Sequence, residues 1–317
     1  MKLLHCAVLL VNLLAGGCLG DTAEQVPGQH FHYIVSDMQL HKQQQSGSPI
    51  VAIQGLDLDG DNNGDNQLGA VFNLLRSNGF EIQPTLTAAI QNGDILLGLD
   101  VQTPNMQNAD SVNVQVRTGF AASPTPCSGD APIMCGQHLH GDATIVVDAP
   151  TPSLYSTGAL SKSVLLTRGG ILPVRLALEK NNYIELNLHE AAVSITFEDT
   201  NPTGTLAGVV LAADIERVLV PQIGLQFRRI VDEDCGTKVP GRHRRLQYCQ
   251  CRAQSRGFYL LALFDQNEDC LVSDQEIMAN SLTRSLLSPD IEGPDGDGFS
   301  FAIAIKLAPA TFALVAP

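Results

Sequence analysis

Apolar and polar residues alternate along several stretches of the chain with a period of two, which is the pattern of half-buried β-strands. Turn residues such as Gly169-Gly170 and Asn181-Asn182 separate these stretches. They cover residues 30–40, 49–56, 94–101, 112–116, 143–148, 174–178, 184–188 and 193–197, and a last one places Phe301, Ile303, Ile305 and Leu307 on one face. These short strands predict a predominantly antiparallel β fold, either a sandwich or an open barrel.

Apolar residues at helical spacing occur between and after these strands. A helix facing the core is predicted by four residues at i, i+3, i+4 and i+7, namely Leu68, Val71, Phe72 and Leu75. Helical spacing also predicts helices over 85–91 and 206–220. Two more are expected at 257–264 and 276–287, on either side of a polar loop. The fold class is therefore α+β, with a C-terminal EF-hand-like helix-loop-helix.

The polar loop at 265–276 has oxygen donors where a calcium ion in an EF-hand loop needs them. Such loops coordinate calcium from positions 1, 3, 5, 7, 9 and 12, with a backbone carbonyl at position 7. Those positions are filled by Asp265, Asn267, Asp269, Leu271, Ser273 and Glu276. Position 6 usually carries glycine because it needs a positive φ, and here it is Cys270. We predict a calcium site; the alternative is an acidic turn that binds no ion.

A second acidic loop, at 57–65, resembles the DxDxDGxxD calcium loops of thrombospondin type 3 repeats and dockerins. Its expected ligands are Asp57, Asp59, Asp61, the Asn63 carbonyl and Asp65. Their carboxylates would repel one another without a cation. A register that starts at Asp59 instead places Gly64 at the glycine position but gives up ligands. A solvated acidic turn remains the alternative to a second calcium site.

Neither register of the second loop has an acid at position 12, so the loop at 265–276 has no well-formed EF-hand partner. EF-hands that act as switches need a pair of helices that opens on binding. A single loop stabilises the folded chain by mass action instead. We therefore expect calcium to be a structural cofactor.

The first twenty residues are typical of an export signal, since Lys2 and His5 precede an apolar run over residues 6–14. Ala15-Gly16-Gly17-Cys18 resembles a bacterial lipobox, which predicts lipidation of Cys18 and membrane attachment. Ordinary secretion with cleavage near Gly20 is the alternative. The chain is thus expected in the outer membrane or periplasm as a lipoprotein, or secreted.

After this signal we expect four segments. These are a tether at 21–29, a β-rich domain at 30–230, a loop rich in cysteine and arginine at 231–256, and a module at 257–317 with the EF-hand-like loop and the final strand.

Eight cysteines are present, of which Cys6 and Cys18 lie in the signal. The others are Cys127, Cys135, Cys235, Cys249, Cys251 and Cys270. An even number in an oxidising compartment predicts three disulfides. Cys127 and Cys135 enclose a short loop and are expected to pair with each other. The other four allow three pairings, and all three remain open.

The formal net charge of −14 argues against nucleic acid as a partner, because the phosphate backbone would be repelled. The exception is a basic run over 228–256. It contains Arg228, Arg229, Lys238, Arg242, Arg244, Arg245, Arg252 and Arg256, eight of the 19 basic residues. Such a run can bind an anionic glycan or lipid, although a solvated loop is the simpler interpretation.

Sequence motifs give little support to an enzyme. The chain has no GxSxG, SxxK, P-loop or Rossmann glycine fingerprint. His30 and His32, like His138 and His140, alternate on expected strands, and we interpret that spacing as strand alternation rather than a metal site.

Three stretches together carry a family resemblance: the lipobox-like leader, LDLDGDNNGDNQLG at 56–69, and LFDQNEDCLVSDQEIMANSLTRSLLSPD at 263–290. They resemble a group of uncharacterised bacterial secreted lipoproteins with EF-hand-like calcium loops. The resemblance implies a β-rich exported protein and no known activity. We expect an exported calcium-binding protein of the bacterial envelope. A binding module for an envelope glycan or protein is the alternative, and an enzyme of unrecognised type is a weaker one.

Overall fold

The computed structural model describes residues 28–40, 53–77, 82–127, 135–149, 155–179, 182–197, 200–235, 249–293 and 296–314. The signal at 1–20 with Cys18, and most of the tether at 21–29, lie outside these residues. Residues 236–248 of the loop rich in cysteine and arginine also lie outside them. No helix in the described ranges is long and apolar enough to cross a bilayer.

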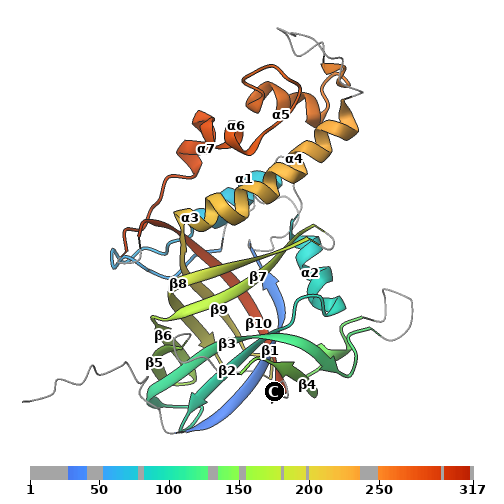
Figure 1. Ribbon diagram of the computed structural model, residues 1–317. Helices are drawn as coiled ribbons and strands as arrows, with labels where there is room; N and C mark the ends of the chain where they lie inside the picture. The colour runs from blue at the N-terminus through green and yellow to red at the C-terminus, as the bar shows by residue number, and fades with distance from the viewer. Residues whose placement is uncertain are drawn as a thin grey trace, which may run out of the picture.

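Eight antiparallel strands form a closed barrel (Figure 1). Around the ring they are β1 (Gln29–Gln39), β2 (Leu97–Thr103), β3 (Ala109–Ser123), β5 (Ser156–Ser161), β6 (Val164–Arg168), β8 (Asn182–Thr196), β9 (Thr203–Leu211) and β10 (Gly298–Leu314). Two pairings between distant strands, β1 with β10 and β3 with β5, complete the ring. The β-rich prediction is confirmed, but the sheet forms neither a sandwich nor an open barrel. The final strand belongs to the barrel.

Two further strands extend the barrel at its ends. β4 (Ala143–Val147) pairs antiparallel with β3 and parallel with β10. β7 (Ile171–Glu179) forms a hairpin with β8. The long strands β3, β8 and β10 therefore pair with different neighbours along their length.

The alternating residues predicted to face one side are buried inside the barrel. Phe301, Ile303, Ile305 and Leu307 of β10 belong to the main core. An eight-stranded barrel has an interior just wide enough for side chains to fill it. A smaller apolar cluster, which includes Ile145, lies under β4.

The helices lie mostly beyond one end of the barrel (Figure 1). They are α1 (Gln67–Ser77), α2 (Ile82–Asn92), α3 (Ala212–Asp214), α4 (Val220–Asp234), α5 (Arg256–Phe264), α6 (Asp274–Ala279) and α7 (Ser281–Leu286), with short 3-10 and π segments at Gln137–Leu139 and Ile215–Leu219. α1 matches its prediction, and Phe72 packs on Phe301 with ring centroids 5.5 Å apart. The apolar face of α1 thus covers the barrel core.

The helix predicted over 206–220 is wrong in its first half. Residues up to Leu211 form β9, and the helical segment begins at Ala212 and continues through α4 to Asp234. Leu206, Ala207, Val209 and Val210 are all buried, so both faces of this strand are covered. A short continuous apolar run of this kind fits a buried strand as well as a helix, and the pairing of β9 between β8 and β10 decides for the strand.

The helix expected over 276–287 is interrupted. Asn280 has an extended backbone with φ −64° and ψ 133°, and it separates α6 from α7. Its side-chain oxygen accepts a hydrogen bond from the Leu282 N–H, which caps α7, and its amide donates to the Leu263 carbonyl at 2.7 Å. The chain after the 265–276 loop therefore turns back toward α5 instead of continuing as one helix.

Candidate functional site

The loop at 265–276 lies between the end of α5 and the start of α6. Ser255 caps the start of α5 and Ser273 that of α6. Ser273 and Glu276 form a capping box, in which each side chain accepts a hydrogen bond from the other residue's backbone N–H. The second helix thus begins inside the twelve-residue stretch.

Three of the predicted calcium ligands turn their side chains into this loop. Asp265 accepts hydrogen bonds from the N–H groups of Asp269, at 3.0 Å, and Cys270, at 2.9 Å. The Asn267 side-chain oxygen accepts from the Asp269 N–H at 2.9 Å, and Asp269 accepts from the Leu271 N–H at 2.8 Å. The oxygens at positions 1, 3 and 5 are therefore on the inner side of the loop.

Glu276 joins the end of the loop to its beginning. One carboxylate oxygen accepts hydrogen bonds from the N–H groups of Gln266, at 3.0 Å, and Asn267, at 3.3 Å. The other accepts from the Ser273 hydroxyl at 2.8 Å. Because that hydroxyl also caps α6, we expect Ser273 to serve an ion through a bridging water, which is common at position 9.

Burial and mutual repulsion affect the acids of this loop. Burial raises the pKa of Asp265, and the charges of Asp269 and Glu276 act in the same direction. Burial would also raise the pKa of Glu276, but its hydrogen bonds from Ser273, Asn267 and Gln266 outweigh burial and hold that pKa below the usual value. Glu276 therefore remains an anion although two other predicted ligands of the loop, Asp265 and Asp269, are also carboxylates.

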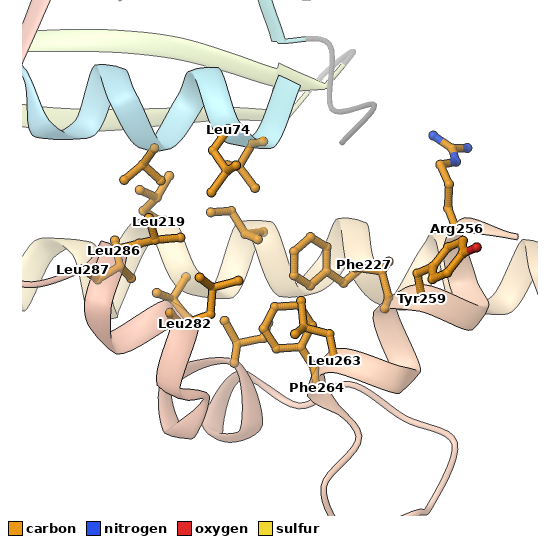
Figure 2. A pocket seen from close by; sticks show the side chains of 17 residues that line it. Leu74, Leu219, Phe227, Arg256, Tyr259, Leu263, Phe264, Leu282, Leu286 and Leu287 are labelled. Atoms are coloured by element: carbon orange, nitrogen blue, oxygen red, sulfur yellow. The ribbon is translucent and has the colours of Figure 1, made fainter. Parts of the chain in front are cut away.

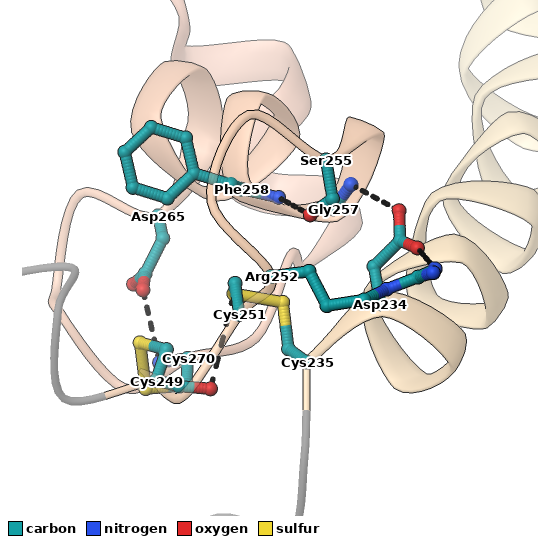
Figure 3. The surroundings of a disulfide bond; sticks show 10 residues. All are labelled: Asp234, Cys235, Cys249, Cys251, Arg252, Ser255, Gly257, Phe258, Asp265 and Cys270. Atoms are coloured by element: carbon teal, nitrogen blue, oxygen red, sulfur yellow. Dashed lines mark hydrogen bonds and ion pairs between the residues drawn. A yellow bond between two sulfur atoms is a disulfide. The ribbon is translucent and has the colours of Figure 1, made fainter.

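A disulfide holds the turn where glycine is usual. Cys270 has a φ of 64° and is bonded to Cys249. Figure 3 shows this bridge beside the Asp265 side chain, which accepts the Cys270 N–H. A left-handed backbone costs a residue with a Cβ about 1–2 kcal/mol, and the bridge to Cys249 restrains Cys270 in that conformation.

All three disulfides are present in the structure. The expected Cys127–Cys135 bond is confirmed. The open pairing is settled as Cys235–Cys251 and Cys249–Cys270. Figure 3 shows the latter two side by side, between the end of α4 and the 265–276 loop. They tie the end of α4 to the segment before α5 and that segment to the loop.

The loop at 57–65 has left-handed residues at the same two positions as the loop at 265–276. Gly60 and Asn62, at positions 4 and 6 from Asp57, have φ values of 87° and 68°. At the same positions of the other loop, Glu268 and Cys270 have φ values of 60° and 64°. Gly64 is not among the residues with positive φ. The backbone therefore selects the register that begins at Asp57.

The hydrogen bonds of this loop agree with that register. Asp57 accepts from the N–H groups of Gly60, at 2.6 Å, and Asn62, at 3.1 Å. Asp59 accepts from the Asp61 N–H at 3.0 Å, and Asp61 from the Asn63 N–H at 2.7 Å. As in the other loop, the N–H groups at positions 5, 6 and 7 meet the side-chain oxygens at positions 3, 1 and 5. Carboxylate oxygens of Asp57, Asp59 and Asp61 lie within 4.8 Å of one another.

Asp65 closes the loop in place of the missing acid at position 12. Its carboxylate accepts the Leu58 N–H at 2.7 Å, which is the N–H at position 2, the position that Glu276 contacts in the other loop. Position 12 is Leu68, a residue of α1 that is buried in the core. Burial raises the pKa of Asp65, and the charges of Asp59 and Asp61 add to that effect. A cation among these carboxylates would lower their repulsion.

Two contacts fix the 57–65 loop to the barrel. Asn66 accepts the Ala302 N–H at 3.0 Å and donates to the Ile53 carbonyl at 2.8 Å. Arg168 of β6 donates to the Asp57 carbonyl at 2.5 Å. The loop is therefore attached to both β10 and β6 at the point where α1 begins.

Replacement of Asn62 tests the assignment of position 6. Asn62→Gly is expected to leave stability and calcium affinity unchanged or slightly higher, because glycine adopts positive φ without strain. Asn62→Ala is expected to lower the free energy of unfolding in calcium by about 1 kcal/mol. Urea denaturation in the presence of calcium measures the stability of both variants. Equal stability of the two variants would contradict the register that starts at Asp57.

The donors of both loops suit calcium best. They are carboxylate, amide, hydroxyl and carbonyl oxygens, which are the hard ligands that calcium prefers. Magnesium requires near-ideal octahedral geometry and keeps most of its water. The mixed oxygen set of each loop therefore fits the larger ion.

The basic run at 228–256 is only partly described. Arg228 contacts Asp274 at 2.8 Å, Arg229 contacts Glu179 at 2.5 Å, and Arg252 pairs with Asp234. Lys238, Arg242, Arg244 and Arg245 lie outside the described residues. Three of the four described arginines of the run are therefore in ion pairs, and the fourth, Arg256, has no ion pair among the described residues.

A polar cluster at the side of the barrel includes the first histidine pair. The Asp100 carboxylate lies 2.8 Å from His30 Nδ1, 3.7 Å from His32 Nε2 and 3.6 Å from Arg117 Nη1. Asp100 and Arg117 are both buried. Because the guanidinium already neutralises the carboxylate, we interpret this cluster as a buried ion pair with two histidines at its edge.

Sequence reasoning missed several residues that shape the two loops. The left-handed residues Gly60 and Asn62 had a signal, since glycine and asparagine are the residues most common at positive φ. No sequence signal indicated that Asp65 closes its loop or that Arg228 contacts Asp274, because both contacts depend on the folded chain. Helical periodicity likewise predicted an uninterrupted helix through Asn280.

A comparison of the chain with protein-family models, curated proteins and solved structures finds no match.

Proposed function

We propose that this chain is an exported calcium-binding protein, in which calcium bound at 265–276 and at 57–65 stabilises the fold. The ligands at 265–276 are Asp265, Asn267, Asp269, the Leu271 carbonyl and Glu276, with Ser273 acting through water. Those at 57–65 are Asp57, Asp59, Asp61, the Asn63 carbonyl and Asp65. With the short helices on either side of 265–276, we propose that this segment is an EF-hand-like module.

The observation that supports the proposal most is the shared geometry of two loops with different sequences. Both have left-handed residues at positions 4 and 6, and both turn the side-chain oxygens at positions 1, 3 and 5 toward the same backbone N–H groups. The acid that closes the loop differs, since it is Asp65 in one and Glu276 in the other. A solvated acidic turn has no reason to repeat this arrangement.

A structural role fits better than a switch. Arg228 of α4 donates to Asp274 and to the Val272 carbonyl, and the Cys249–Cys270 bond restrains the middle of the loop. A sensor needs helices that move apart on binding, and these links oppose such a movement. Calcium is therefore expected to raise stability by mass action, by about 2.7 kcal/mol at a concentration 100 times the dissociation constant.

The location proposed for this function is the bacterial envelope. The signal-like segment at 1–20 and the three disulfides support export to an oxidising compartment. Lipid on Cys18 would attach the mature chain to a membrane, and cleavage near Gly20 would release it. Mass spectrometry of the mature N-terminus separates these two outcomes.

Calcium titration of the parent and of two single-loop variants tests the proposal. Calorimetry is expected to find two calcium ions per parent chain, and one in each of Glu276→Gln and Asp59→Asn. The affinity of the altered loop is expected to fall at least tenfold, about 1.4 kcal/mol, because a charged ligand becomes neutral. Thermal melting in calcium and in chelator reports the matching loss of stabilisation.

Two exposed acids outside the loops supply matched controls. Glu216→Gln and Asp110→Asn make the same chemical changes at exposed positions and are expected to leave both calcium sites intact. The absence of binding heat and of a melting shift at millimolar calcium would rule out the proposal. A loss of both sites in one single-loop variant would show that the loops do not bind independently.

A further inference from the structure

An apolar groove runs between four helical elements at the end of the barrel (Figure 2). Its walls come from α1, from α4 with the π segment before it, from α5 and from the α6–α7 segment, and include Leu74, Leu219, Phe227, Phe264 and Leu286. The cavity has a volume of about 300 Å³. Ligand pockets in proteins span about 300–1,000 Å³, so this one is at the small end and has room for one narrow molecule.

The groove leaves large apolar side chains in contact with water. Of the exposed large hydrophobic residues in the described ranges, four line it: Leu74 at 38%, Tyr259 at 57%, Leu263 at 43% and Leu282 at 47% exposed. Exposed apolar patches that cluster in this way mark binding surfaces more often than scattered single residues do. The groove therefore has the character of a site whose apolar occupant replaces water.

Among the described residues, one charged side chain lines the groove, and it lies at one end. Arg256 begins α5, and Figure 2 shows it beside Tyr259, away from the leucines at the other end. The described part of the chain gives its guanidinium no hydrogen-bond partner. Asp234 is close enough to feel its charge, but that carboxylate already accepts from the Gly257 N–H and from Arg252.

We propose that this groove binds a single linear fatty-acid anion, with its acyl chain along the apolar walls and its carboxylate at Arg256. The ligand that complements the groove is apolar along its length and negative at one end. A guanidinium matches a carboxylate through two parallel N–H···O bonds. The small volume favours one acyl chain over a lipid with two. This inference goes beyond calcium binding and does not depend on it.

Binding of decanoate and decanol, which share one chain length, tests both parts of the proposal by calorimetry. The parent is expected to bind one decanoate per chain, about tenfold more tightly than decanol, because only the carboxylate makes charge-assisted hydrogen bonds. Arg256→Gln is expected to remove this preference and to leave decanol binding unchanged. Loss of affinity for both ligands in this variant would contradict the role given to Arg256.

Variants of the exposed rim test the apolar part without disturbing the core. Leu263→Gln and Leu282→Gln are each expected to weaken both ligands about fivefold, since each removes apolar contact from the groove. Leu225→Gln is the matched control, because Leu225 lies on α4, is 49% exposed and does not line the groove. It is expected to change neither affinity.

Three results would overturn the proposal. The first is that neither ligand binds the folded parent. The second is that binding persists unchanged in both rim variants. The third is that light scattering shows a dimer of the parent that Leu263→Gln separates into monomers, since a second copy would then occupy the groove. Calcium titration of the same variants is expected to match the parent, so failure here leaves the calcium proposal standing.

Discussion

Replacement of both Cys249 and Cys270 by alanine is expected to lower the free energy of unfolding by about 3 kcal/mol and to weaken the calcium site proposed at 265–276. The first effect follows from the 21-residue separation of the two cysteines, because the bridge limits the conformations of the unfolded chain. The second follows from the φ of 64° at Cys270, because the bridge no longer restrains this position in a conformation that costs a residue with a Cβ about 1–2 kcal/mol. Urea denaturation and calcium calorimetry measure the two effects separately.

A glycine variant separates the bridge from the backbone conformation. Cys249→Ala with Cys270→Gly also lacks the disulfide, but glycine takes positive φ without strain. It is expected to bind calcium more tightly than the alanine pair while it shares most of the loss of stability. If the two variants bind calcium equally, the conformation at position 6 does not limit the site.

The Cys127–Cys135 bridge provides the matched control. Replacing both cysteines by alanine is expected to cost roughly 2.5 kcal/mol, because the separation is shorter, 8 residues. Neither cysteine is near either acidic loop in the sequence, so calcium affinity is expected to be unchanged. A fall in calcium affinity here would mean that general destabilisation, rather than the state of Cys270, weakens the site.

The strands of the barrel could be predicted because their alternation depends only on which face is buried. Phe301, Ile303 and Ile305 follow that rule in β10. Closure of the ring could not be predicted, because it depends on pairing β1 with β10, strands at opposite ends of the chain. β9 was mistaken for a helix for a related reason, since Val209 and Val210 are covered on both faces only once neighbouring strands are in place.

The calcium ligands could be predicted from one short stretch of sequence, whereas the features around them depend on distant parts of the chain. Spacing alone selected Asp265, Asp269 and Glu276, whose oxygens do turn into their loop. The pairing of Cys249 with Cys270 belongs to one of three pairing schemes, and the sequence does not distinguish among them. The apolar groove needed four helical elements from distant parts of the chain, so no single periodicity indicated it.

Asp100→Ala is expected to lower the free energy of unfolding by about 3–5 kcal/mol, because it leaves the Arg117 guanidinium buried without its carboxylate. The two side chains are 5% and 4% exposed and lie 3.6 Å apart. Arg117 also donates to the Asp148 carbonyl and lies over the Phe312 ring, so it cannot turn to water without breaking other contacts. Urea denaturation at pH 7.5 measures the loss.

The double variant Asp100→Leu with Arg117→Met distinguishes an unpaired charge from lost packing. It removes both charges and keeps most of the apolar volume, so it is expected to recover most of the stability that Asp100→Ala loses. A double variant as unstable as Asp100→Ala would mean that the shape of this cluster matters more than its charge balance.

The neighbouring His32 gives the single variant a distinctive dependence on pH. Burial lowers the pKa of His32 below its usual 6.5, while the Asp100 charge raises it, and the ring stacks on Phe312 at 4.3 Å. Below pH 6.5 the unfolded chain therefore binds more protons at this residue than the folded chain, so stability falls as the pH falls. Without Asp100 the folded pKa drops further. Asp100→Ala is thus expected to lose stability more steeply than the parent between pH 6.5 and 5, and parallel profiles would show that Asp100 does not act on His32.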